Sequence, residues 1–178
     1  MRKLACIAVL MAAMPLAAAA QQAPAADASI GYSFLRLGGS GGSNQNGVSG
    51  SMAYNLNSWL GVAADFGGYH SSPQGVGLTT FTYMFGPRLT YRTNSKVNPF
   101  AEVLFGAGHL KASAGGVSVS SSPFAYAFGG GADLNVSENI SFRPQVDYIG
   151  LRSNGSTENC ARISAAVVFH FGQSKGSF

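Results

Sequence analysis

The chain has 178 residues, of which 46% are hydrophobic and only 10% are charged, whereas soluble domains average about 25% charged residues. The length suits one domain, and a formal net charge of +4 without any Lys/Arg cluster excludes nucleic acid as an expected partner. After the first 20 residues, no run approaches the roughly 18 apolar residues of a transmembrane helix. The chain must therefore cover its apolar surface by some other means.

Residues 1–20 have the three parts of a secretory signal peptide. Arg2 and Lys3 give a positive start, an apolar run follows, and four alanines precede Gln21. We expect this leader to be cleaved, and residues 21–27 to form a small-residue linker. The mature chain then keeps a single cysteine, Cys160, so no internal disulfide can stabilise the fold.

From residue 28 to residue 171 the hydrophobic pattern has a period of two, which is typical of strands with two different faces. Longer connections rich in Gly, Ser and Asn alternate with tight turns between these strands. The predicted strands are 28–37, 47–55, 59–69, 78–92, 98–111, 123–134, 139–151 and 160–171. This alternation predicts an up-and-down meander with two unlike ends, followed by a short tail over residues 172–178.

The two faces of the predicted strands differ in chemistry. One carries most of the aromatic residues, and the other is mostly Gly, Ala, Ser and Thr with a set of ionisable residues. For this second face we predict an interior ionic network made of Asp65, Arg88, Glu102, Arg143, Asp147 and Arg162, with Asp133 on the same face. Arg88 and Glu102 lie equally far from the centre of the turn at 93–97, which predicts a direct ion pair across adjacent strands.

The aromatic face is predicted to point outward. An eight-stranded barrel has an interior only just wide enough for side chains, so it cannot hold a double layer of Phe and Tyr. With that face against lipid and the small face inside, a closed barrel satisfies every backbone group in hydrocarbon. We therefore predict an all-β protein: an eight-stranded antiparallel up-and-down transmembrane β-barrel over residues 28–171.

Outward aromatic residues gather near both ends of the predicted strands, which indicates two girdles at the membrane–water interfaces. These residues are Phe34, Tyr54, Phe66, Phe81, Tyr91, Phe124, Phe142, Tyr148 and Phe171. Arg36 and Lys111 share the outward parity at long-loop ends. There they can reach anionic headgroups or lipopolysaccharide phosphates, or simply extend to water.

Six segments in this order and spacing carry a family resemblance: GYSFLRL, FGPRLTYR, PFAEVLFGAG, FAYAFGGGADLNV, RPQVDYIGLR and ISAAVVFHFG. Together they resemble the small eight-stranded outer-membrane barrels of Gram-negative bacteria, the OmpA-like and opacity-like β-barrel family. The resemblance implies a bacterial outer-membrane location, termini in the periplasm and long loops outside the cell. It also implies contact with outer-membrane lipid and lipopolysaccharide, and we expect a monomer.

The resemblance further implies insertion by the barrel-assembly machinery, with periplasmic chaperones, through a final strand that ends in an aromatic residue. The residues of that signal strand are Ile163, Ala165, Val167, Phe169 and Phe171. The chain continues to Phe178, so either Phe171 or Phe178 could be the terminal aromatic of the signal.

The sequence predicts no catalytic, cofactor-binding or metal-binding residue. His70, His109 and His170 lack the spacing of metal ligands. Some related barrels are lipid A deacylases with a His-x-Ser-Asn motif, but here Leu151 takes the histidine position before Ser153.

The leading interpretation is a non-enzymatic outer-membrane barrel with a structural or surface-interaction role and a lumen filled by side chains. A soluble periplasmic barrel that binds an apolar ligand, or a lipid A-modifying barrel enzyme, are the alternatives.

Overall fold

The computed structural model describes residues 24–38, 42–72, 76–92, 96–115, 117–153 and 155–173. The predicted signal peptide, Asn154 and Phe178 lie outside these residues. Within the described ranges, no helix is both long and apolar enough to cross a membrane.

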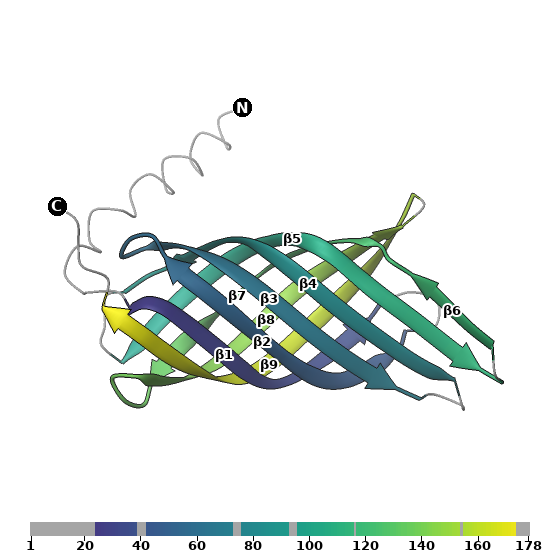
Figure 1. The fold of residues 1–178 in the computed structure, drawn as a ribbon, viewed down its shortest axis with the longest axis horizontal. Coiled ribbons are helices and arrows are strands. Elements are labelled where there is room, and N and C mark those ends of the chain that lie inside the picture. The colour runs from purple at the N-terminus through teal and green to yellow at the C-terminus, as the bar shows by residue number, and fades with distance from the viewer. Residues whose placement is uncertain are drawn as a thin grey trace.

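The structure is a single sheet that closes on itself (Figure 1). Its strands are β1 (Pro24–Leu37), β2 (Asn44–Asn55), β3 (Leu60–Ser71), β4 (Gly77–Thr90), β5 (Val97–Ala114), β6 (Val117–Ser121), β7 (Phe124–Asn135), β8 (Ile140–Ser153) and β9 (Ser156–Gln173). The sheet order is β4-β3-β2-β1-β9-β8-β7-β5-β6, and pairing of β4 with β5 closes the cylinder. Because β6 stands outside the closed ring, the barrel has eight strands, all paired antiparallel, as predicted.

The predicted connection at 112–122 proved to be mostly a hairpin. β5 pairs first with β7 over Val97–Ala107 and then with β6 over Leu110–Ala114. β6 and β7 therefore form one interrupted strand, broken at Pro123, which has no N–H to donate to the ladder. Figure 1 shows β5 and β6 projecting together beyond one end of the barrel.

The first strand begins earlier than predicted, because β1 starts at Pro24 inside the segment interpreted as a linker. Ala26 pairs with both Tyr54 of β2 and Phe171 of β9. Residues 24–27 lack large apolar side chains, so the alternation that marks the other strands is invisible there. Both ends of the described chain lie at the short-turn end of the barrel (Figure 1).

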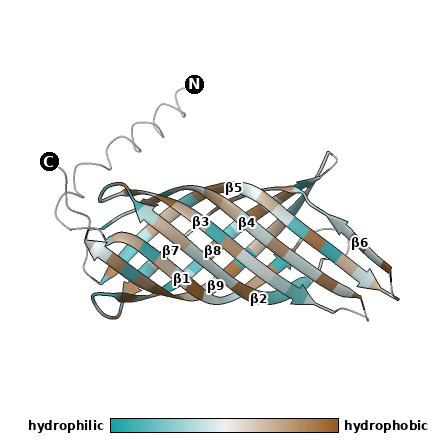
Figure 2. Cartoon of the chain, viewed as in Figure 1, coloured by the Kyte–Doolittle hydropathy of each residue, from teal (hydrophilic) through white to brown (hydrophobic). Residues whose placement is uncertain are grey.

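The side chains alternate between the two faces of the wall as predicted. In β4, Phe81, Tyr83 and Phe85 are exposed on the outside, whereas Thr82 and Met84 between them are buried. Figure 2 shows the resulting alternation of apolar and polar residues along the strands.

The interior is less uniform than the sequence indicated. Toward the long-loop end it is filled by aliphatic side chains, among them Leu35, Leu37, Leu104, Ile149 and Leu151. The predicted small and polar face therefore also carries a layer of large apolar residues. The charged groups lie nearer the middle and the short-turn end, so the lumen has two chemically distinct layers.

This orientation of the wall can be tested with spin labels on Tyr83→Cys and Tyr126→Cys in a Cys160→Ser background. Both positions face outward, so in a bilayer their labels should meet lipid-dissolved oxygen more than a water-soluble nickel chelate. The measurement is power-saturation electron paramagnetic resonance, with Ser120→Cys on the exposed β6 as the aqueous control. Labels at 83 and 126 that prefer the nickel chelate would contradict a lipid-facing aromatic surface.

Candidate functional site

The predicted pair of Arg88 and Glu102 forms inside the barrel. The two residues stand directly opposite each other on β4 and β5. Arg88 Nε donates to Glu102 Oε2 at 2.8 Å, and both side chains are almost fully buried. Equal distance from a short turn, combined with inward parity, is enough to bring the two groups together.

Asp27 joins Arg88 to a second arginine. Its Oδ1 accepts from Arg88 Nη1 and from Arg143 Nη2, each at 3.2 Å. Arg143 also binds Asp133 through two nitrogens, Nε at 2.5 Å and Nη2 at 2.9 Å, a bidentate geometry typical of strong arginine–carboxylate pairs. The Ser51 hydroxyl oxygen accepts from both arginines at 3.3 Å.

Phe100 is the aromatic side chain at the centre of this cluster. The guanidinium carbons of Arg88 and Arg143 lie 4.9 Å and 4.8 Å from the centre of its ring. This is cation–π distance, so the ring interacts favourably with both cations while excluding water from between them.

Arg162 organises a second cluster nearer the middle of the barrel. It binds Asp65 at 2.6 Å and 3.2 Å and Asp147 at 2.8 Å. Gln145 links the two clusters, since its Nε2 donates to Glu102 and to Asp147, each at 2.9 Å. The result is one continuous network in which every interior carboxylate has a polar partner.

Three of the ion pairs cross the lumen. Arg88 to Asp27 joins β4 to β1, Arg143 to Asp27 joins β8 to β1, and Arg162 to Asp65 joins β9 to β3. None of these strand pairs is adjacent in the sheet. The network therefore ties together strands that are not neighbours in the sheet, in addition to pairing neighbours.

Arg92 adds a cation just beyond β4, at the short-turn rim. It donates to the carbonyl oxygen of Ser58 at 2.6 Å and to Asn55 Oδ1 at 3.1 Å. Burial lowers the pKa of its guanidinium from its ordinary value, and the nearby carboxylate of Asp27 offsets part of that effect. The group stays charged and closes this end of the interior.

All six residues predicted for the interior network lie in the lumen and take part in it. The sequence did not predict that Asp27, Gln145 and Phe100 belong to the interior network. It placed Asp133 on the inward face but predicted no partner for it. The sequence prediction places Asp27 in the linker, although the inward parity of β1 reaches it when continued backward from Ser33. Gln145 and Phe100 gave no signal, because only the closed geometry shows what they meet.

The residues predicted for the aromatic girdle all point outward. Seven are exposed, whereas Phe34 and Tyr148 are half-buried among neighbours. Tyr148 stacks on Phe128 with ring centres 4.7 Å apart, and its hydroxyl donates to Asn159. The signal-strand residues Ile163, Ala165, Val167, Phe169 and Phe171 also face outward, along β9.

Ser141 and His170 form a pair that looks like a nucleophile and base, but the hydrogen bonds run the wrong way. The Ser141 hydroxyl donates to Asn135 Oδ1 at 2.6 Å, and His170 Nε2 lies 2.7 Å from Ser141 Oγ. A hydroxyl has one proton, so His170 must donate here and cannot act as the base. In the described part of the chain, no three His, Cys, Asp or Glu side chains gather as a metal site.

The closed eight-stranded antiparallel barrel, with an apolar outside and an ionic inside, can be compared with known domain families. The profile of the outer membrane protein β-barrel domain matches residues 4–171. The chain belongs to this family. It is thus a transmembrane β-barrel of the bacterial outer membrane.

Solved structures show the same fold. Neisserial surface protein A aligns with a TM-score of 0.73 at 15% identity, covering 85% of this chain and 100% of that one. Ail, the attachment invasion locus protein of Yersinia pestis, gives 0.58 at 22% identity over 83% and 99% of the two chains. The N-terminal barrel domain of Pseudomonas aeruginosa OprF gives 0.58 at 16% identity over 84% and 100%. Comparison with curated sequences gave no match.

A double-mutant cycle on Arg88→Ala and Glu102→Ala tests the energetic coupling within the network. Each single change leaves a buried charge short of a partner, which should lower the free energy of unfolding by about 3–5 kcal/mol. The double variant should lose less than the sum, by about 0.5–3 kcal/mol, as measured by urea unfolding in detergent micelles. Glu102→Ala combined with Arg152→Ala on the outer surface is the additive control, and equally additive losses for both pairs would argue against coupling.

Proposed function

We propose that this barrel is a non-enzymatic outer-membrane protein with a structural or surface-interaction role. The observation that carries the proposal is the filled lumen. An ionic network spans the barrel from wall to wall, and an aliphatic layer of Leu35, Leu104 and Ile149 lies beyond it. Such an interior supports neither a water-filled channel nor a substrate cavity.

The absence of an assembled catalytic group in the described lumen supports the same proposal. Ser141 is held as a donor to Asn135, and Leu151 is buried where a deacylase would need its histidine. A soluble ligand-binding barrel would instead need an interior cavity, and it would leave Phe85 and Tyr83 exposed to water.

We further propose that the network's role is to fix the register of the strands. A slip of one residue in any strand of the ring other than β2 would turn an inward carboxylate or guanidinium toward lipid. Arg143 and Arg162 each bind carboxylates from two other strands, so such a slip in either strand breaks contacts on both sides of the lumen.

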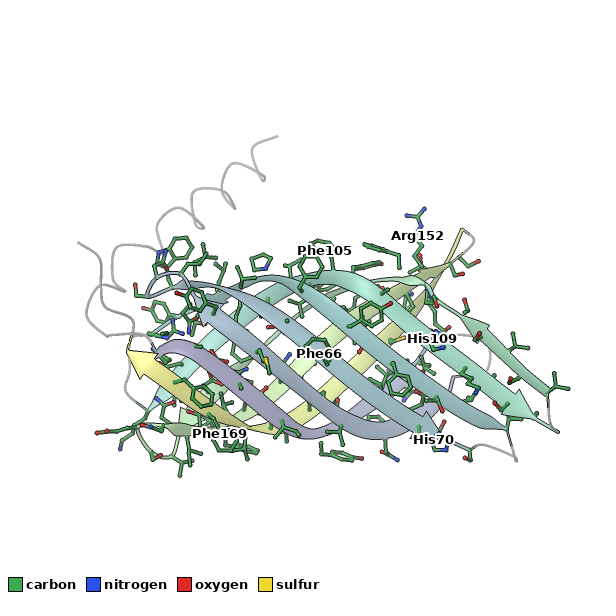
Figure 3. The ribbon with its side chains drawn as sticks, viewed as in Figure 1. Phe66, His70, Phe105, His109, Arg152 and Phe169 are labelled. Carbon is green, nitrogen blue, oxygen red and sulfur yellow. The ribbon has the colours of Figure 1, made fainter. Side chains whose placement is uncertain are left out.

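Outer-membrane lipid and lipopolysaccharide are the proposed surroundings of the outward face. The girdle residues would lie at the two interfaces, and Arg36 and Lys111 are exposed at the long-loop end. His70 and His109 lie toward the same end, away from the chain termini (Figure 3). The acidic residues of the described strands all have inward parity, which supports an outward surface suited to anionic headgroups.

Export and assembly complete the proposal. A cleaved signal peptide would deliver the chain to the periplasm, and chaperones would hand it to the barrel-assembly machinery. Phe171 pairs with Ala26 and is the last outward aromatic of β9, which ends two residues later at Gln173. We therefore assign the end of the assembly signal to Phe171, and expect a monomer in the membrane.

Conductance in planar bilayers tests the filled lumen. The purified protein should show no sustained open state, because side chains from every wall meet inside. Leu104→Ala with Ile149→Ala thins the aliphatic layer and should leave conductance near zero, since the ionic layer below it remains closed. Sustained conductance of the unaltered protein, or a changed lipid A profile when it is overproduced, would contradict the proposed function.

Outer-membrane yield of variants at the chain end tests the assembly signal. Phe171→Ala should lower the amount of folded barrel, measured as the heat-modifiable band on unboiled gels, whereas Phe178→Ala should leave it unchanged. Ala161→Phe, another exposed outward position of β9, controls for general changes in the strand. A larger loss with Phe178→Ala than with Phe171→Ala would move the signal to the tail.

A further inference from the structure

Two outward-facing glycines create a groove on the lipid side of the barrel. Gly50 of β2 lies between Ile30 and Phe66, and Gly68 of β3 lies between Val48 and Phe81. The flanking side chains are all more than half exposed, so they stand as walls on either side of a floor without side chains. The groove has a volume of about 430 Å³ and a mostly apolar lining.

A polar cluster lies beyond the groove, toward the long-loop end of the same face. His70 follows Gly68 by two residues on the same face of β3, and Thr79 stands opposite it on β4. His70 Nδ1 lies 3.1 Å from Thr79 Oγ1, and its Nε2 lies 3.2 Å from Ser72 Oγ. Lys111 stands opposite Thr79 on β5 and is exposed.

The outward face of strands β2 to β5 carries basic side chains and no acidic ones. The described strands β2 to β5 carry two acidic residues, Asp65 and Glu102, and both are buried in the lumen. On the outside of these strands, His70, His109 and Lys111 therefore meet no carboxylate from their own or adjoining strands. An anionic group beside Thr79 would be neutralised by a cation and would accept hydrogen bonds from its neighbours.

We propose that this groove and its polar cluster form a binding site for one lipid A molecule of the outer leaflet. An acyl chain would lie over Gly68 and Gly50, and a glucosamine phosphate would bind Lys111, Thr79 and His70. The site deepens the proposed contact with lipopolysaccharide and rests on the long-loop end facing outward. The polar cluster with Lys111 would bind a phosphate, and the apolar groove would bind an acyl chain. Together they favour a phosphorylated, acylated lipid over a free phosphate.

The groove floor at Gly68 and the neighbouring polar cluster can be altered without disturbing the barrel. A Cβ added at Gly68 would meet only the ring edge of Phe81, at 3.3 Å and 3.5 Å, and that ring can turn away. At Gly50, by contrast, a Cβ would lie 2.8 Å from the backbone oxygen of Ser29, so that position is unsuitable. Gly68→Leu therefore fills the groove, and His70→Ala with Lys111→Ala removes the headgroup contacts.

Matched controls separate this site from general attraction. Arg152→Ala removes another exposed cation at the loop end, but from β8, which does not line the groove (Figure 3). Ala101→Leu adds an apolar side chain to the outward face of β5, also outside the groove. Each variant must first give the heat-modifiable band of a folded barrel.

The experiment is native mass spectrometry of the mature protein in detergent, with added hexa-acylated lipid A, dephosphorylated lipid A or inorganic phosphate. We expect a one-to-one complex with lipid A that weakens by about tenfold in Gly68→Leu and in the His70/Lys111 double variant. Both controls should bind as the unaltered protein does. Dephosphorylated lipid A should bind weakly, and inorganic phosphate should not displace lipid A.

Unchanged binding in Gly68→Leu, or an equal loss in Arg152→Ala and in the double variant, would overturn the site. Either result would leave the proposed outer-membrane role intact, because general charge attraction would then account for lipid binding. Conductance or a changed lipid A profile would instead contradict the proposed role and would not bear on the groove.

Discussion

The narrow interior of an eight-stranded barrel is the constraint on which the rest of this structure depends. Eight strands leave room for side chains and little else, while the outer wall must contact hydrocarbon. Away from the strand ends, ionisable residues can then lie only inside, where they are costly unless paired. The inward parity of Asp65, Arg88 and Glu102 and their complete pairing are two consequences of this single geometry.

Much of the architecture was accessible from the sequence for the same reason. A period of two, with aromatic residues on one parity and charges on the other, determines which side chains face outward before any contact is known. The Arg88–Glu102 pair followed from turn geometry alone, because a short hairpin fixes which residues stand opposite each other. These predictions needed only local information, either along one strand or across one turn.

The features that sequence reasoning missed all depend on non-local geometry. Asp27 lies before the first apolar residue of β1, and its partners Arg88 and Arg143 come from strands that do not adjoin it. The sequence did not predict the aliphatic layer of Leu104 and Ile149. The parity of a residue predicts that it faces inward, but it does not show which residues of other strands lie at the same height in the barrel. β6 was missed because its serines and glycine-rich turn resemble an irregular loop.

The ionic layer and the aliphatic layer of the lumen differ in how they respond to a shift of a strand. Apolar packing tolerates changes of neighbour, since a leucine that moves along the barrel axis within the aliphatic layer still contacts other apolar side chains. A guanidinium such as Arg162, held between Asp65 and Asp147, has no equally satisfied position one residue away. The ionic layer therefore specifies register, while the aliphatic layer fills the lumen beneath the loops. A buried ion pair is weak evidence for stability, and the role proposed for this network is to discriminate between one pairing of the strands and the next.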